Sequence, residues 1–303
     1  MCEPWKLDDM VIHKIVEEQH AYNTIERFMP GLDLELVEEN LDWFSKDGLE
    51  PDTRKVILSY HSFIVETPKY RVLIDSCIGN HKNIAMRDTW HNKTDSRWMD
   101  AFDATGLTVD DIDYVLCTHL HADHVGWNTQ LKDGKWVPTF PNARHLMVDE
   151  EFVFTRDFAK NHEPGLPISD VFTASFAESV QPLVDAGKVD FVSATHALGD
   201  YFRLLPTPGH TPGHSAVLAG RNRDLAVFTG DLIHSPIQAK YPDILMFTDE
   251  DPTRAAATRR EFLEKFADTE TLVCTMHFPH PSVGYVRRWG EGYRLEYVTP
   301  KSL

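Results

Sequence analysis

Alternation of hydrophobic and polar residues predicts strands in both halves of this chain. The segments 9–20, 55–66 and 70–75 alternate with a period of two, and the turn Thr67-Pro68-Lys69 separates the last two. Apolar runs of strand length predict further strands at residues 113–117, 143–148, 189–192, 201–205, 215–219, 225–229 and 272–276.

Helical patterns are interspersed with these strands. They predict helices near residues 98–104, 149–158, 171–186 and 252–267, the last with Pro252 in its first turn. Residues 33–46 are acidic with clustered leucines, which suits a helix or an amphipathic arm. We therefore predict an α+β fold in which two mixed β-sheets are flanked by helices. The 303 residues would form a single domain, with an N-terminal arm at about 1–50 and a polar excursion at 79–106 as a candidate lid.

Charge and hydropathy exclude several classes of partner. The formal net charge of −17, with no run of Lys and Arg to offset it, disfavours nucleic acid and anionic lipid. No apolar stretch approaches the ~18 residues of a membrane span, and the first ten residues do not resemble a secretory leader. Cys2, Cys77, Cys117 and Cys274 form no C-x-x-C pair. We expect buried thiols, a cytoplasmic location, and no nucleic-acid or membrane partner.

The candidate chemistry lies in residues 118–126, with the sequence Thr-His-Leu-His-Ala-Asp-His-Val-Gly. Three imidazoles and a carboxylate within six residues are ligand types that suit zinc and neighbouring metals. In an extended segment His119 and His121 point the same way, while Asp123 and His124 follow the turn and can face a second point. One loop could therefore supply ligands to two metal ions.

This run resembles the first motif, H-x-H-x-D-H, of the metallo-β-lactamase superfamily, whose members have an αββα sandwich fold. Three later pieces match in order: His210 in the sequence Thr-Pro-Gly-His, Asp231 at the end of a predicted strand, and His277 after another. The resemblance covers roughly residues 55–286.

The resemblance implies a hydrolase with two divalent metal ions, zinc or alternatively manganese, iron or cobalt, and a metal-bridging hydroxide as the nucleophile. Asp123 is also a candidate catalytic residue, because a carboxylate there could accept the proton of the attacking water. The implied ligands are His119, His121 and His210 for one ion, Asp123, His124 and His277 for the other, and Asp231 as a bridge between them.

Two branches of the superfamily look most similar. Acyl-homoserine lactonases carry a tyrosine three residues beyond the bridging Asp, where this chain has His234. Residues 230–238 and 277–284 instead resemble the methyl-parathion-hydrolase type. His234 is a second candidate catalytic residue, either an acid for the leaving group or a wall of the pocket. We predict that the chain opens a lactone or cleaves an ester of a small, largely apolar molecule, with phosphotriesterase side activity.

Other functions stay open. An organophosphate triester hydrolase comes next, followed by a glyoxalase-II-like thioesterase. The thioesterase would need cations such as Arg287, Arg288 and Arg294, whose alternating sequence instead suits an exposed strand. A metal-binding scaffold without turnover is the non-enzymatic alternative. The resemblance also implies a homodimer.

Overall fold

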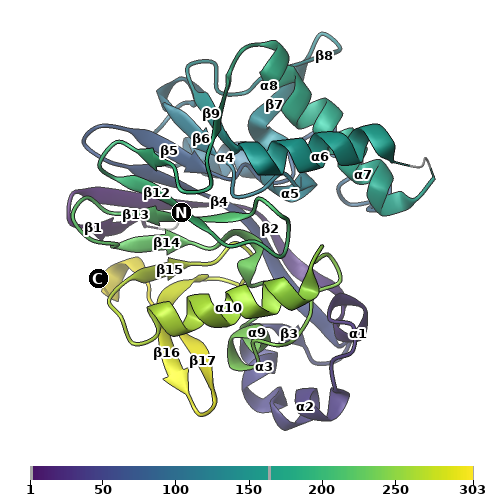
Figure 1. Ribbon diagram of the computed structural model, residues 1–303, viewed down its shortest axis with the longest axis vertical. Coiled ribbons are helices and arrows are strands. Elements are labelled where there is room, and N and C mark those ends of the chain that lie inside the picture. Colours follow the sequence, from purple (N-terminus) through teal and green to yellow (C-terminus); the bar gives the residue numbers. More distant parts are fainter. Residues whose placement is uncertain (1–2, 163–164, 303) are drawn as a thin grey trace. The chain divides into compact units, whose positions relative to one another are not determined.

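A computed structural model describes residues 3–162 and 165–302 of this chain. The chain divides into two compact units, each made of two segments (Figure 1). The first unit contains residues 1–17 and 60–194, and the second contains residues 18–59 and 195–303. Strands β2 (Met10–Thr24) and β4 (Lys55–Glu66) begin in one unit and end in the other.

A mixed sheet forms the centre of the first unit. Its order is β1-β2-β4-β5-β6-β9-β10, and β3 also pairs with β4. The pairs β5–β6, β6–β9 and β9–β10 are parallel, whereas β1–β2 and β4–β5 are antiparallel. A separate hairpin joins β7 and β8. The remaining strands of the first unit are β1 (Trp5–Leu7), β5 (Arg71–Ile74), β6 (Tyr114–Leu116), β7 (Thr129–Lys132), β8 (Lys135–Pro138), β9 (Arg144–Val148) and β10 (Val189–Val192). The residues of β3 (Leu49–Glu50) belong to the second unit.

Among the helices of the first unit, α6 begins directly after strand β9. Three acidic residues occupy the first turn of α6, where they complement the positive end of the helix dipole. A buried apolar cluster that includes Trp98, Trp127 and Phe176 joins these helices to the sheet. The helices are α4 (Arg97–Asp103), η1 (Val109–Asp111), α5 (Ala122–Val125), η2 (Gly126–Asn128), α6 (Asp149–Asn161), α7 (Pro167–Ser175), η3 (Phe176–Val180) and α8 (Gln181–Asp185).

The second unit contains another mixed sheet, in the order β11-β12-β13-β14-β15-β16-β17. Only β14 and β15 pair in parallel among the described strands of this sheet. The strands are β11 (Ala197–Leu198), β12 (Phe202–Pro206), β13 (Ser215–Ala219), β14 (Ala226–Phe228), β15 (Leu272–Cys274), β16 (Val283–Trp289) and β17 (Gly292–Tyr297).

Helix α10 covers this sheet with Phe262, Leu263 and Phe266 in a common apolar cluster with Val227 and Val273. It begins as predicted, since the side chain of its N-cap Asp251 accepts a hydrogen bond from the Arg254 N–H. The helices of the second unit are α1 (Ile25–Phe28), α2 (Leu34–Glu39), α3 (Leu41–Asp47), η4 (Gly230–Leu232), α9 (Pro236–Lys240), α10 (Pro252–Phe266) and η5 (Pro300–Ser302).

Two predicted helices are interrupted. The helix expected within 33–46 breaks at Asn40, whose side-chain amide donates to the Leu36 carbonyl and so competes with the backbone. The helix expected at 171–186 begins earlier and contains the π-helical turn η3. Pro182, which has no N–H to continue the α-helical pattern, follows this turn.

Buried polar contacts hold the excursion 79–106 at its base. The Lys93 ammonium pairs with the fully buried carboxylate of Glu17, which also accepts hydrogen bonds from the Ile78 N–H (2.8 Å) and the Trp127 indole (3.1 Å). The Lys82 ammonium donates to the Thr129 hydroxyl at 2.7 Å. Burial lowers the pKa of Lys82 to about 7. The role of this segment as a lid stays a prediction.

Cys77, Cys117 and Cys274 are buried, as expected of thiols in apolar strands, while Cys2 lies outside the described residues. No described helix combines the length and the apolar character that crossing a bilayer requires.

Candidate metal centre

In the first unit, two parallel strands deliver polar residues to one edge of the sheet. Asp75 directly follows β5, and the run from Thr118 to Gly126 follows β6. The run ends tightly packed, because a Cβ atom on Gly126 would lie 1.9 Å from the Ile78 carbonyl oxygen. Only glycine allows this approach.

Four of the predicted ligands gather at this edge. The ring centroid of His119 lies 4.5 Å from that of His121 and 4.1 Å from that of His124. A carboxylate oxygen of Asp123 lies 3.8 Å from Nε2 of His124. The three histidines are buried and Asp123 is half-buried, so solvent reaches this set mainly at the Asp123 carboxylate.

Asp75 fixes the orientation of this set. One of its carboxylate oxygens accepts hydrogen bonds from the Thr118 hydroxyl and from Nδ1 of His124, both at 2.8 Å, and the other accepts the Thr118 N–H at 2.7 Å. Nε2 of His124 would therefore be its ligand atom. Asp75 was not among the predicted site residues, although a polar residue at the end of an apolar strand was the available signal.

In the second unit, the other three predicted ligands also meet at strand ends. Asp231 follows β14 and His277 follows its parallel neighbour β15, while the β12–β13 loop with His210 opens at the same edge. The Asp231 carboxylate lies 2.9 Å from Nε2 of His277, 3.2 Å from Nε2 of His210 and 3.1 Å from Nε2 of His234. Asp231 thus contacts three imidazoles.

Further hydrogen bonds orient these groups. Nδ1 of His210 bonds to Asp249 at 3.0 Å, and Nδ1 of His277 bonds to the Ser59 carbonyl at 3.2 Å. The backbone N–H of Asp231 donates to Nε2 of His214 at 2.9 Å. His214 therefore fixes the backbone of Asp231. Asp249 was missed, and nothing in the sequence links it to a histidine 39 residues earlier.

Electrostatics distinguish the two histidines beside Asp231. Burial opposes protonation of His210, but the carboxylates of Asp231 and Asp249 outweigh it and raise the pKa of His210 to about 9. For His234, burial dominates over the attraction of Asp231, and its pKa is lowered. The two carboxylates thus favour a positive charge at His210, which either a proton or a bound metal ion would supply, whereas burial favours the neutral ring of His234.

His234 is buried in contact with the arm. Its backbone N–H donates to the Gln238 side chain at 2.9 Å, and its ring stacks on that of His277 with centroids 5.4 Å apart. The ring of Phe28 from α1 meets His234 edge to face at 6.1 Å. The arm thus covers a candidate catalytic residue of its own unit.

The donors fit a divalent metal. Asp231, His234 and His277 each offer one ligand atom, and these atoms lie within 4.8 Å of one another. Imidazole nitrogen and carboxylate oxygen are common ligands of zinc, and the orienting bonds to Asp75 and Asp249 are of the kind that metal-binding histidines make. These groups could therefore hold a metal ion.

A comparison with known families decides the classification. The model of the metallo-beta-lactamase superfamily matches residues 57–277. The chain belongs to the metallo-β-lactamase superfamily. The predicted fold class, two mixed β-sheets with flanking helices, is confirmed.

Individual superfamily members are more distant. The probable metallo-hydrolase YflN of Bacillus subtilis (strain 168) is 27% identical over an alignment of 144 residues. The alignment covers 45% of this chain and 50% of YflN. The chain thus spans about half the length of the curated relatives that head its matches. Among solved structures, the hydrolase AbOPH has a TM-score of 0.82 and 24% identity. AidC, a dizinc quorum-quenching lactonase in complex with its product, has a TM-score of 0.80 and 21% identity. Each alignment covers 98% of this chain and 97% of the other.

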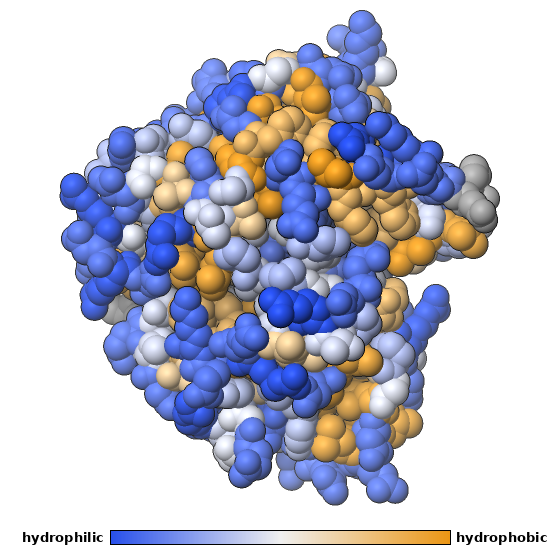
Figure 2. Space-filling view, viewed as in Figure 1, coloured by the Kyte–Doolittle hydropathy of each residue, from blue (hydrophilic) through white to orange (hydrophobic). Residues whose placement is uncertain are grey.

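A row of aromatic residues begins at the predicted ligand His121. The Phe172 ring stacks on His121 with centroids 4.7 Å apart, Phe158 packs edge-on against Phe172 at 5.5 Å, and Phe154 follows at 6.2 Å. Figure 2 shows hydrophobic residues gathered over α6 and α7, on a face that is otherwise largely hydrophilic. Tryptophans do not contribute to this row at Trp98 and Trp127, which stack on each other in the core. The spacing i, i+4 of Phe154 and Phe158 was the available sequence signal for the row.

Proposed function

We propose that this chain is a dinuclear-metal-dependent hydrolase that opens a lactone or cleaves an ester of a small, largely apolar molecule. The observation that carries the proposal is the contact of Asp231 with three imidazoles in a member of the metallo-β-lactamase superfamily. The likeness to AidC, a dizinc lactonase, supports this reaction class.

Seven side chains are proposed as metal ligands, with zinc as the native metal. Asp75, His214 and Asp249 would position them through the hydrogen bonds described above. Following the resemblance, His119, His121 and His210 would bind one ion, Asp123, His124 and His277 the other, and Asp231 both.

Divalent cations at these donors would lower the pKa of water and polarise the carbonyl oxygen of the substrate. Asp123, which is half-buried, would accept a proton during the attack. His234 would donate a hydrogen bond to the leaving oxygen, since burial lowers its pKa and keeps an N–H on a neutral ring.

The aromatic row supports an apolar substrate. Phe154, Phe158 and Phe172 are each half-exposed, and Phe172 lies directly against the proposed ligand His121. An acyl chain or an aryl group against these rings would lose apolar surface to water, at about 25 cal/mol per Å² buried. A glutathione thioester, with its carboxylates, gains nothing from such a surface.

A substrate panel tests the proposal. The zinc-loaded chain is given a γ-lactone, an aryl ester, S-lactoylglutathione and methyl parathion, with acid release or chromophore release as the readout. We expect the lactone or the ester to have the highest kcat/KM and methyl parathion a lower value. A tenfold preference for the thioester would contradict the proposal, and two bound metals without any turnover would favour the scaffold.

Substitution of His234 separates its three candidate roles. His234→Leu is expected to keep two metals per chain and to lower kcat by about tenfold to a hundredfold, while His234→Gln, which retains an N–H, recovers part of the rate. Loss of one metal would instead make His234 a ligand. A change in KM alone would make it a wall of the pocket.

For Asp123, the matched variant is Asp123→Asn. We expect a lower kcat that does not recover when excess zinc restores full occupancy, because the amide cannot accept the proton. Full metal content with an unchanged rate would remove the proton-transfer role.

A further inference from the structure

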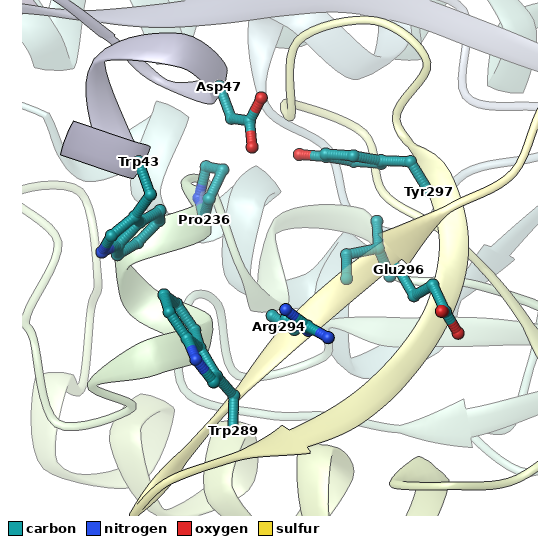
Figure 3. Close-up of a pocket in the computed structure, with 8 residues that line it drawn as sticks. Trp43, Asp47, Pro236, Trp289, Arg294, Glu296 and Tyr297 are labelled. Atoms are coloured by element: carbon teal, nitrogen blue, oxygen red, sulfur yellow. The ribbon is translucent and has the colours of Figure 1, made fainter.

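A cavity lies in the second unit, where α3, α9 and the hairpin β16–β17 meet. Its volume is ≈ 380 Å³, within the range of small-molecule sites. Figure 3 shows the residues that line it, none of which is a proposed metal ligand. The lining includes Trp43, Asp47, Pro236, Trp289, Arg294 and Tyr297.

Two indoles form the apolar wall of this cavity. The rings of Trp43 and Trp289 meet edge to face with centroids 5.0 Å apart, and Pro236 lies beside them. The indole N–H of Trp43 is already bonded to the Asn40 side chain at 2.8 Å, which fixes the orientation of the ring. Both indoles are half-exposed, so a ligand could cover their remaining apolar surface.

One end of the cavity is acidic. The Tyr297 hydroxyl and the Asp47 carboxylate approach the same space in Figure 3. Partial burial raises the pKa of Asp47 despite the neighbouring Lys46, and burial next to Asp47 raises that of Tyr297. Within residues 3–162 and 165–302, Asp47 forms no ion pair and the Tyr297 hydroxyl forms no hydrogen bond.

The other charged group is a cation. The Arg294 guanidinium lies 5.9 Å from the centroid of the Trp289 ring and has no ion-pair partner among the described residues. Its neighbour Glu296 instead bonds to Arg287 at 2.9 Å, and its side chain points away from the cavity in Figure 3. Asp47 and Arg294 are both exposed, and neither forms an ion pair among the described residues, so the cavity offers one carboxylate and one guanidinium to a ligand.

We propose that this cavity binds a small zwitterion: an aliphatic chain with an ammonium group at one end and a carboxylate at the other. The ammonium group meets Asp47 and the Tyr297 hydroxyl, the methylene groups pack on the two indoles, and the carboxylate meets Arg294. A simple anion would leave Asp47 without an ion-pair partner, and a simple cation would leave Arg294 without one. Only opposite charges on one ligand complement both groups.

The test uses 6-aminohexanoate as the probe and the full chain in isothermal titration calorimetry. Hexanoate lacks the ammonium group and hexylamine lacks the carboxylate, so each removes one of the two charge contacts at nearly constant shape. We expect saturable binding of 6-aminohexanoate and at least about tenfold weaker binding of the other two, the range expected for one charged hydrogen bond.

Variants assign this binding to the cavity. Asp47→Asn and Arg294→Gln are each expected to weaken 6-aminohexanoate binding at least about tenfold. Asp42→Asn is the matched control on the same helix, since Asp42 is exposed and does not line the cavity. Its affinity is expected to equal that of the unaltered chain.

Three outcomes would overturn the proposal. The first is no saturable binding of 6-aminohexanoate. The second is equal affinity for hexanoate, which would make the cavity a simple anion site. The third is a native mass that falls by half in Trp289→Ala, because a second copy of the chain would then be the occupant.

Discussion

At the scale of single residues, carboxylates that are not proposed ligands control the imidazoles that are. Asp75 holds His124 and Asp249 holds His210, each through Nδ1, so that Nε2 would be the ligand atom in both cases. A carboxylate in this position also makes the imidazole a stronger ligand for a metal. We therefore expect metal affinity to depend on residues outside the ligand motifs.

Replacing Asp75 tests this dependence. Asp75→Asn keeps the size of the side chain but turns one acceptor oxygen into an NH₂ group, which cannot accept the bonds from both Thr118 and His124. We expect zinc affinity to fall about 10–100-fold, measured by competition with a chromophoric chelator. Asp103→Asn, an exposed position on α4, is the control. Equal affinities would contradict the role of Asp75.

A different residue sets the response of the fold to acid. His145 on β9 is fully buried, on the same side of the strand as the core residues Ala143 and Met147. Neither of its ring nitrogens has a hydrogen-bond partner among the described residues. Burial lowers the pKa of His145 to about 3.

The sign of the resulting pH dependence follows from linkage. Below about pH 6.5 the unfolded chain binds a proton at His145 that the folded chain does not bind until about pH 3. The free energy of unfolding therefore decreases as the pH is lowered from about 6.5 to about 3. The contribution is about 1.4 kcal/mol per pH unit. In urea unfolding of the metal-free chain from pH 7 to pH 4, His145→Leu is expected to lose less stability than the unaltered chain. His196→Gln, a half-exposed control, should follow the unaltered chain; identical slopes for all three would refute the assignment.

At the scale of elements, parallel strands explain why ligands distant in sequence meet. β5 and β6 bring Asp75 to the H-x-H-x-D-H run, and β14 and β15 bring Asp231 to His277. Neighbouring parallel strands end at one edge of a sheet, so residues just beyond them converge. No such convergence of strands places the excursion 79–106, whose position depends on side-chain contacts.

The pair Glu17–Lys93 tests how this excursion is held. Lys93→Met would leave the Glu17 carboxylate buried without its cation, and we expect a loss of about 3–5 kcal/mol in unfolding free energy. Faster proteolysis within 79–106 should accompany it. Adding Glu17→Gln should recover part of the loss, and Lys135→Met on the exposed β7–β8 hairpin should change stability by less than about 0.5 kcal/mol. A loss no larger in Lys93→Met than in the control would show that the pair is unimportant.

Much of the fold could be predicted from the sequence pattern, because strands such as β13, β14 and β15 are short, largely apolar and buried along their whole length. The ligands could be predicted because a dense cluster of histidines has no common structural explanation. The hairpin β7–β8 and the short elements β1, β3, β11, α1 and α9 were not predicted. They are too short or too polar to show a period, and tertiary contacts stabilise them. Residues that orient the histidines, such as Asp249, could not be predicted for a related reason, since they approach their partners only in the folded chain.

At the scale of the whole molecule, bound metal should contribute to stability. A ligand that binds only the folded state stabilises it by about 3–4 kcal/mol at 100 to 1,000 times its Kd. We therefore expect EDTA to lower Tm by several degrees and to abolish hydrolysis, with zinc restoring both. Zinc-saturated EDTA is the control. An unchanged Tm after verified metal removal would count against metal-coupled folding.

The oligomeric state also belongs to this scale. The arm packs on its own unit, since Phe28 contacts the rings of His234 and Phe247 and both Phe28 and Phe44 are buried. Dimerisation stays a prediction, with light scattering expected to give twice the monomer mass. Leu34→Glu, at an exposed leucine of α2, should reduce that mass if this part of the arm forms the contact.

The division into two interleaved units has a consequence for biosynthesis. The first unit has its full sequence once residue 194 has left the ribosome, whereas residues 18–59 must await residues 195–303. At about 5–20 residues per second, this delay lasts roughly 5–20 s. During this delay Phe28 lacks two rings that contact it in the folded chain, those of His234 and Phe247, so a chaperone that recognises exposed apolar segments would meet the nascent chain here.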